Sequence, residues 1–234
     1  MRARRNFVRL IALSVFISLF LPLSRLLSAQ MTEMQCKDFI NQEIKNIPGW
    51  CSPKKAEAMM DLIFKTKPDV CVELGVFAGA SLLPTAMALK HLNHGIVYAV
   101  DAWNEEKAIQ YYEEDSPHRI WWGNQDMALH YNFFVTLIKK HKLNYHCIIL
   151  KEQFESALSK IDHIDILHID ASHTNKGDFI DVKPYTSKIK KGGYIWFDGW
   201  ATSPDLYEYL KSAYEIKKVV TAGQCILLQK VTED

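Results

Sequence analysis

The sequence has few cysteines and lacks the spacings with which cysteine usually holds a metal. Its five cysteines include no C-x-x-C pair and no cysteine–histidine pattern typical of zinc, which excludes a zinc site of those types. Cys71, Cys147 and Cys225 lie in apolar runs, where a buried free thiol is the usual state. Cys36 and Cys51 flank a short segment and could form a disulfide if the chain is exported. Five free thiols are the alternative.

A basic surface is also lacking, which argues against nucleic acid as a partner. The formal net charge is +1, and five of the 28 basic residues are arginines within residues 1–30, which contain no acidic residue. The rest of the chain carries 23 basic against 27 acidic side chains, a balance of −4. A mildly acidic domain without a basic stripe is not expected to bind nucleic acid.

No uncharged run is as long as a typical membrane-spanning helix. Leu10 to Ser24 is 15 residues without a charge, whereas a spanning helix needs about 20. This run follows an arginine-rich start, and Ser28-Ala29 offers small residues for cleavage, which is the pattern of a signal peptide. We expect residues 1–30 to direct export to the periplasm or the cell exterior. An uncleaved membrane anchor, or a misplaced start codon, is the alternative, and this segment is the only expected contact with a membrane.

Apolar strand-like runs alternate with helical periodicity from residue 55 onward, and the sequence shows no repeats or low-complexity segment. We predict strands at 70–74, 96–100, 145–150, 164–169, 194–197, 215–221 and 225–229, with helices at 56–66, 80–92, 125–141, 152–160, 178–189 and 206–214. This alternation predicts an α/β, doubly wound, mostly parallel seven-stranded sheet of Rossmann-like type. The turn Ala222-Gly223 predicts a C-terminal antiparallel hairpin. Residues 55–234 would form the main domain and 31–54 an N-terminal attachment.

Acidic residues accompany the ends of four predicted strands. Glu73 lies at the end of the first strand, and Asp101, Asp170 and Asp198 follow the second, fourth and fifth. In open α/β sheets, ligands bind outside the carboxyl ends of the strands, near the point where the strand order reverses. We therefore expect these four carboxylates to gather at the ligand-binding edge.

The glycine turn after the first strand lacks the spacing of a dinucleotide site. That spacing would place glycines two and five residues after Gly75, where the chain has Phe77 and Ala80. An NAD(P)-dependent oxidoreductase is therefore disfavoured, and Glu73 suits a cationic ligand instead. Asp101, which lies 26 residues after Gly75, could accept both hydroxyls of a ribose, or it could cap the segment that follows.

Taken in order, these motifs resemble those of class I S-adenosylmethionine-dependent methyltransferases. The matching residues are Glu73-x-Gly75-x-x-x-Gly79, Asp101, Asp170-Ala171-Ser172-His173, Lys191-Gly192-Gly193 and Phe197-Asp198. The most similar subgroup has an I-D-G-x-H motif after its fourth strand and contains sugar- and antibiotic-modifying O-methyltransferases. The resemblance covers about residues 55–230.

The resemblance implies a cofactor, S-adenosyl-L-methionine, and residues that hold it. Glu73, Gly75 and Gly79 would line its methionine part, Asp101 would bind its ribose, and Gln153 and Phe154 would contact its adenine. Several members of the subgroup also bind Mg²⁺ through the acid after the fourth strand and an acidic pair after the fifth. Asp170 and Asp198 match these ligands, but the second member of the pair is Gly199, so Mg²⁺ is possible with one ligand missing.

Methyl transfer to oxygen needs a base that removes a proton from the acceptor. His173 is the candidate base, and Asp170 could orient it or take the proton itself. The predicted function is O-methylation of a small, sugar-like or hydroxylated acceptor beneath an aromatic-rich lid at residues 103–124, whose aromatic side chains could instead pack over the edge of the sheet. His168, which lies within a strand, is expected to be structural. A non-catalytic, nucleoside-binding member of the fold is the alternative, which Gly199 and the apparent export signal both favour.

Overall fold

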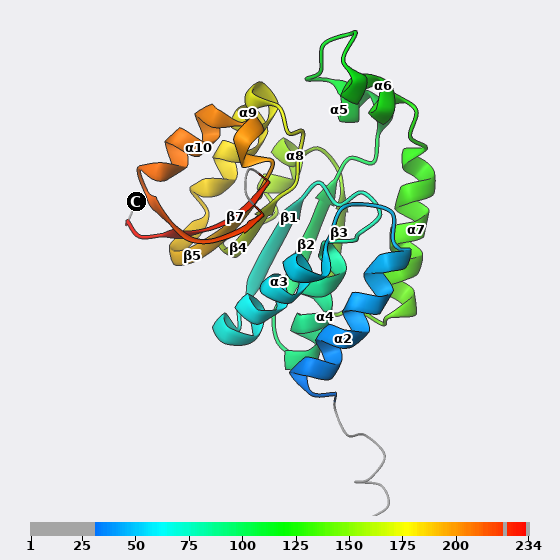
Figure 1. The fold of residues 1–234 in the computed structure, drawn as a ribbon, viewed down its shortest axis with the longest axis vertical. Helices are drawn as coiled ribbons and strands as arrows, with labels where there is room; N and C mark the ends of the chain where they lie inside the picture. The colour runs from blue at the N-terminus through cyan, green and yellow to red at the C-terminus, as the bar shows by residue number, and fades with distance from the viewer. Residues whose placement is uncertain (1–30, 222–223, 233–234) are drawn as a thin grey trace, which may run out of the picture. The chain divides into compact units, whose positions relative to one another are not determined.

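A computed structural model of the chain describes residues 31–221 and 224–232. Seven strands form one sheet in the order β3-β2-β1-β4-β5-β7-β6 (Figure 1). They are β1 (Val70–Leu74), β2 (Ile96–Asp101), β3 (Cys147–Lys151), β4 (Ile164–Ile169), β5 (Ile189–Asp198), β6 (Tyr214–Thr221) and β7 (Cys225–Lys230). The first five run parallel, and β7 is antiparallel to both β5 and β6. The predicted fold class and the closing hairpin are confirmed.

Helices cover both faces of this sheet (Figure 1). On one side lie α2 (Glu33–Glu43), η1 (Ile44–Asn46), α3 (Pro53–Thr66), α4 (Leu82–Leu92) and α7 (Met127–Lys140), and on the other lie α8 (Phe154–Leu158), α9 (Asn175–Thr186) and α10 (Pro204–Lys211). Two short helices, α5 (Glu105–Ile109) and α6 (Pro117–Gly123), occupy the predicted lid, and η2 (Trp200–Thr202) follows β5. All six predicted helices are present. Helix α2 is an addition within the predicted attachment, and its Cys36 and Ile40 are buried in the same core as α3 and α4.

Successive strand residues enter two different cores because side chains alternate across a sheet. In β1, Cys71 packs with the α2–α4 side, whereas Val72 packs with the α8–α10 side. In β5, Trp196 belongs to the first core and Phe197 to the second. Glu73 therefore shares the face of Cys71, beneath the helices α3 and α4.

The start of β5 differs from the prediction. The strand was predicted to begin at residue 194, but β5 begins at Ile189 and includes Lys191-Gly192-Gly193. The register between β4 and β5 shifts there, from Ile164 opposite Ile189 to Ile166 opposite Tyr194. The extra residues are accommodated as a bulge, and Gly192 takes a φ of +81° that favours glycine.

Three other expectations concern the ends and the cysteines. All five cysteines are free thiols, so Cys36 and Cys51 do not form the disulfide that was one alternative.

Within the described residues, no helix combines the length and the apolar character needed to cross a membrane. The predicted signal peptide or anchor at residues 1–30 and the hairpin turn at 222–223 lie outside the described residues.

Candidate active site

A cavity of about 1350 Å³ opens at the carboxyl ends of the central strands. Its lining includes seven of the nine residues predicted for the site, namely Gly75, Asp101, Gln153, Phe154, Asp170, His173 and Asp198. The cavity lies where β1 separates β2 from β4, which is the reversal point of the strand order. Pockets for one small ligand usually measure about 300–1,000 Å³. This cavity therefore has room for a cofactor and a second small molecule together.

Glu73 and Gly79, the other two predicted residues, do not line the cavity. Glu73 is 1% exposed and its Oε1 accepts a hydrogen bond of 2.7 Å from the Ser81 hydroxyl. A Cβ on Gly79 would press against the Phe134 ring at 2.6 Å, so this glycine is needed where the loop packs on α7. Both residues shape the loop from beneath and are not placed to contact a ligand in the cavity.

Gly75 lets the ends of β1 and β4 approach each other closely. Its φ is +86°, and a Cβ there would overlap the carbonyl oxygen of Asp170. The Asp170 amide in turn donates a hydrogen bond of 3.0 Å to the carbonyl of Leu74. Because Gly75 has no side chain, the backbone of Asp170 can lie directly against the turn that follows β1.

Asp101 holds the glycine-containing loop through its carboxylate. Its Oδ2 accepts hydrogen bonds of 2.9 Å from the amides of both Val76 and Phe77, and its Oδ1 accepts one of 2.7 Å from Trp103. Burial raises the pKa of Asp101 and these amide bonds oppose the rise. An ionised carboxylate has about four acceptor positions, so one remains for a ligand hydroxyl.

Asp170 and His173 form the expected pair at the cavity. His173 Nε2 lies 3.0 Å from Asp170 Oδ1. Burial lowers the pKa of His173, but the hydrogen bond and charge of Asp170 outweigh it and raise that pKa above the ordinary 6.5. His173 has a left-handed φ of +52°, which costs about 1–3 kcal/mol and is typical of functional sites. Its ring packs on Gly199, where a Cβ would overlap Nδ1.

A buried charge cluster lies beside this pair, and sequence reasoning missed one of its members, Lys55. The Lys55 ammonium is ion-paired with Asp198 Oδ2 and lies 3.7 Å from Asp170 Oδ2. His168 Nε2 approaches the same Asp198 oxygen at 2.7 Å, and His168 Nδ1 lies 3.0 Å from Glu73 Oε2. The cluster therefore links the floor of the cavity to the residues beneath the loop.

The opposite charges in this cluster stabilise one another. Burial would lower the pKa of His168, as would the Lys55 charge, yet Glu73 and Asp198 raise it to about 9. Burial would raise the pKa of Asp198, but Lys55 and His168 hold it far below its usual range. The pKa of Lys55 is raised by Asp170 and Asp198 despite its burial. His168 is thus a charged link between two carboxylates, beyond the structural role expected of it.

The residues at the predicted metal position do not fit Mg²⁺. The candidate ligand atoms of His168, Asp170 and Asp198 all lie within 4.8 Å of one another. However, the Lys55 ammonium already occupies the space between the two aspartates. Position 199, where the resemblance in sequence implied a second acidic ligand, has no room for a side chain because the His173 ring fills it. Mg²⁺ prefers a near-ideal octahedron of oxygen ligands, and this arrangement does not offer one.

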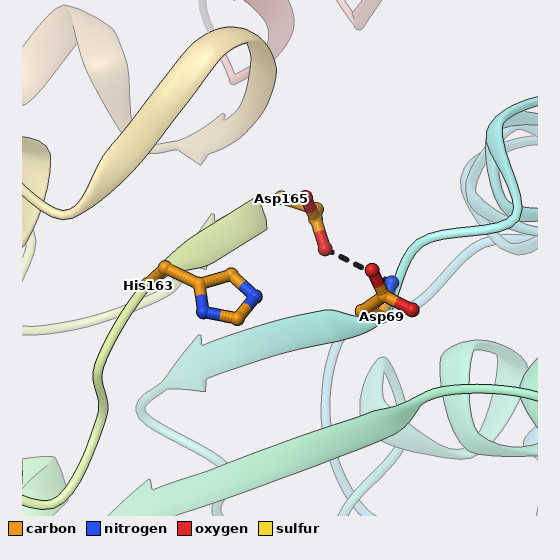
Figure 2. A group of neighbouring side chains, drawn as sticks. All are labelled: Asp69, His163 and Asp165. Atoms are coloured by element: carbon orange, nitrogen blue, oxygen red, sulfur yellow. Dashed lines mark hydrogen bonds between the residues drawn. The ribbon is translucent and has the colours of Figure 1, made fainter.

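A second group of metal-compatible residues lies where β1 and β4 begin, at the other end of these strands (Figure 2). It consists of Asp69, His163 and Asp165. Asp165 Oδ2 accepts hydrogen bonds of 2.9 Å from the amides of Asp69 and Val70, and Oδ1 lies 3.0 Å from Lys190 Nζ. Both oxygens are therefore engaged with the protein, and Asp165 acts as a clamp between the starts of β1 and β4.

The predicted lid lies beyond the carboxyl ends of the strands (Figure 1), and several of its residues line the cavity. Tyr111 donates a hydrogen bond of 2.9 Å to Asp181 of α9, and Tyr112 donates one to the carbonyl of Ser172. These bonds tie α5 and its following turn to the segment that carries His173. The lid is therefore held against α9 and the Ser172 segment on one side of the cavity.

Four aromatic side chains form a wall of the cavity, which we call the aromatic wall: Trp50, Phe77, Trp121 and Trp122. The ring centroids of Trp50 and Trp121 are 5.3 Å apart, and those of Phe77 and Trp122 are 5.5 Å apart. Trp50 and Trp121 remain 65% and 41% exposed. The lid thus contributes aromatic surface to the cavity, whereas its first aromatic residue, Trp103, is 4% exposed and packs on Phe134.

Comparisons with known proteins agree with this geometry. A family model described as a methyltransferase domain matches residues 72–200. The O-methyltransferase NovP has a similar structure, with a TM-score of 0.63 and 15% identity over 77% of this chain and 81% of that one. An O-methyltransferase from Bacillus cereus in complex with SAH has a TM-score of 0.58 and 15% identity, over 84% and 90% of the two chains. SAH-bound PaMTH1 from Podospora anserina reaches 0.60 at 11% identity over 97% of each chain. No curated protein matches the sequence.

Proposed function

The chain belongs to a family of methyltransferase domains, and from that premise we propose that it transfers the methyl group of S-adenosyl-L-methionine to a hydroxyl oxygen. The acceptor would be a small, sugar-like or otherwise hydroxylated molecule. One observation carries this proposal. The Asp170–His173 pair and the loop held by Asp101 face the same cavity, which is large enough for a cofactor and an acceptor.

The cavity residues suit a nucleoside linked to a charged tail. Asp101 retains an acceptor position for a ribose hydroxyl, and the loop it holds lies beside that position. Gln153 and Phe154, which precede and begin α8, line the part of the cavity next to β3, where they can contact a base. When bound, the cofactor would supply an activated methyl group on a sulfonium ion. The protein must then orient the acceptor and receive its proton.

The Asp170–His173 pair would receive that proton. A base is effective when it lies within hydrogen-bond reach of the reacting hydroxyl and has a pKa near the working pH. Burial lowers the pKa of His173, but the hydrogen bond and the charge of Asp170 outweigh that effect and raise this pKa above its ordinary 6.5. Asp170 fixes the orientation of the imidazole and stabilises its protonated form. No step of this mechanism requires a metal ion.

Calorimetry with the full chain tests the cofactor. S-adenosylmethionine and S-adenosylhomocysteine should bind, and NAD should not, because Phe77 and Ala80 stand where a dinucleotide site needs glycine. Asp101→Ala should weaken binding of both sulfur ligands at least tenfold, the effect of losing about 1.4 kcal/mol. The exposed Asp162→Ala is the matched control. Absence of binding to either sulfur ligand would refute the proposal.

A methyl-transfer assay then separates an enzyme from a binding protein. Labelled S-adenosylmethionine and a panel of sugars and hydroxylated aromatic compounds should give labelled product with at least one acceptor. Cofactor binding without transfer to any acceptor would instead favour a non-catalytic, nucleoside-binding member of the fold. Gly199 stands where the resemblance in sequence would place a second acid, and this observation favours the second candidate.

A further inference from the structure

Lys55 occupies a position that helix stability does not explain. Ser52 caps α3 by accepting a hydrogen bond of 3.2 Å from the Lys55 amide, and Pro53 begins the helix. Lys55 therefore lies in the first turn, where the helix dipole disfavours a positive charge by about 0.3–1 kcal/mol. Its side chain is also only 7% exposed, although a lysine is almost never buried unless it is paired. The neighbouring Lys54 is exposed, as lysines usually are.

The Lys55 side chain crosses from α3 to the carboxyl ends of β4 and β5. Its ammonium group is ion-paired with Asp198 Oδ2 and lies 3.7 Å from Asp170 Oδ2. Two carboxylates at one site repel each other unless a cation lies between them. Lys55 supplies that cation from within the chain, and it also lines the cavity.

The alternative cation, a divalent metal, is opposed by two further contacts. His168 Nε2 lies 2.7 Å from the same Asp198 oxygen that Lys55 contacts, so this oxygen already has two partners. A third ligand after β5 is blocked, because the His173 ring fills the space at Gly199. Removal of Lys55 alone would leave His168, Asp170 and Asp198 with ligand atoms within 4.8 Å of one another, which is a spacing that an ion can bridge.

We propose that the Lys55 ammonium takes the place of a divalent cation between Asp170 and Asp198, and that it keeps such ions out of the site. Lys55 is then a positioning residue that holds the two aspartates at the cavity and places a fixed positive charge beside the acceptor. Fixed charge of this kind stabilises negative charge that develops on a reacting oxygen. This second role rests on the proposed function, whereas the exclusion of metal rests on the contacts alone.

Manganese binding tests the exclusion directly, without cofactor or acceptor. Mn²⁺ is titrated into the full chain and followed by calorimetry and by the loss of the free Mn²⁺ paramagnetic resonance signal. The wild type should show no saturable binding at millimolar Mn²⁺. Lys55→Met, which keeps an unbranched apolar stem, should gain a saturable Mn²⁺ site. This site should bind Mn²⁺ at least tenfold more tightly than the wild type does. Lys55→Met combined with Asp198→Asn should lose it again.

Two control variants separate charge from folding. Lys54→Met alters the adjacent exposed lysine and should behave as the wild type does. Lys55→Arg retains a positive charge and should exclude Mn²⁺ as well. Thermal melts of each variant establish that it is folded, and Mn²⁺ should raise the melting temperature of Lys55→Met only.

The outcomes are distinct from those that test the cofactor. Saturable Mn²⁺ binding to the wild type that Asp198→Asn abolishes would overturn the proposal. So would a folded Lys55→Met protein with no new Mn²⁺ site. If the wild type transfers methyl groups, its rate should be unchanged by a chelator. A failure to bind S-adenosylmethionine would refute the proposed function and leave the Mn²⁺ result standing.

Discussion

Asp170 is shared between two partners, and this sharing sets the charge at the reacting side of the cavity. Its Oδ1 contacts His173 Nε2 at 3.0 Å, and its Oδ2 lies 3.7 Å from the Lys55 ammonium. A single carboxylate thus orients the proposed base and balances part of the fixed positive charge beside it. A change at this residue should therefore alter both the rate and its pH dependence.

Asp170→Asn should shift the pH profile of methyl transfer toward acid. His173 must be unprotonated to act as a base, so activity rises as the pH passes its pKa, which Asp170 holds above 6.5. The amide removes the negative charge, which lowers that pKa, and the acidic limb should move down by about one pH unit. The maximal rate should fall about 10²–10⁴-fold because the imidazole loses its orienting partner. The measurement is kcat against pH.

The exposed Asp162→Asn is the matched control for this profile, because it removes one carboxylate away from the cavity. It should leave both the limb and the maximal rate unchanged. A slower Asp170→Asn enzyme whose acidic limb stays in place would show that Asp170 does not act through His173.

The residues that follow strands were predictable from the sequence, and those from other elements were not. Asp101, Asp170 and Asp198 meet at the cavity because parallel strands end at one edge of the sheet. Lys55 is 143 residues away from Asp198 along the chain. It lies on a helix whose orientation over the sheet is set by tertiary packing, which the local sequence pattern does not reveal. Glu73 was predicted to contact the ligand, but it does not line the cavity, for a simpler reason. It is still within β1, so the alternation of the strand turns it into the core beneath the loop.

At the scale of elements, the pairing of β1 with β4 supports the site from below. Asp165, in β4, accepts hydrogen bonds from the amides of Asp69 and Val70 at the start of β1. These two strands carry Gly75 and Asp170 at their other ends. The hydrogen bonds that fix the register of β1 and β4 at their starts therefore also help to fix the close approach of Gly75 and Asp170 at their ends.

Asp165→Asn should destabilise the protein in a pH-dependent way. Burial would raise the pKa of Asp165, but the Val70 amide, Lys190 and the Asp69 amide lower it below 3.8. A carboxyl with a depressed pKa contributes stability that is present above its unfolded pKa and is lost as the pH falls through its folded pKa. The variant should lose about 1–3 kcal/mol of unfolding free energy at pH 7, the value of hydrogen bonds to a charged group.

Urea unfolding at pH 7 and near pH 3 measures this effect, with Asp162→Asn as the control. The difference between wild type and Asp165→Asn should shrink at the lower pH, because the carboxyl of the unfolded chain is protonated there and the stability that comes from the depressed folded pKa begins to be lost. Equal unfolding free energies of the wild type and Asp165→Asn at pH 7 would show that the contacts of the Asp165 carboxylate do not stabilise the fold.

Elements with a strong repeating pattern were predicted closely, and those that depend on neighbours were not. The predicted bounds of β1 and β4 match the structure residue for residue. The helices α5 and α6 were missed because they are 5 and 7 residues long, too short to show an apolar stripe. Their stability comes from caps and from bonds to other segments, such as Asn104 accepting from the Lys107 amide and Tyr111 reaching α9.

At the scale of the whole molecule, positive charge is concentrated at the start of the chain. Residues 33–234 form one compact unit, and the family match lies within it. The five arginines and the 15-residue uncharged run precede that unit in sequence. A methyltransferase needs S-adenosylmethionine, which cells make in the cytosol. Export would separate the domain from this supply, whereas an anchor with the domain on the cytosolic side would keep it.

We propose that residues 1–30 take the chain to a membrane, either for export or as an anchor. The chain with its native start is expressed, the cells are fractionated, and the first residue is determined by N-terminal sequencing. A mature chain that begins near Gln30, in the periplasm or medium, indicates cleavage after Ser28-Ala29. An intact chain in the membrane fraction indicates an anchor, and protease added to sealed cells then reports which side the domain faces. Deletion of residues 1–30 should leave the protein soluble in the cytosol in both cases. An intact chain in the soluble cytosol would contradict the proposal, because a free arginine-rich apolar segment would then have no function in targeting.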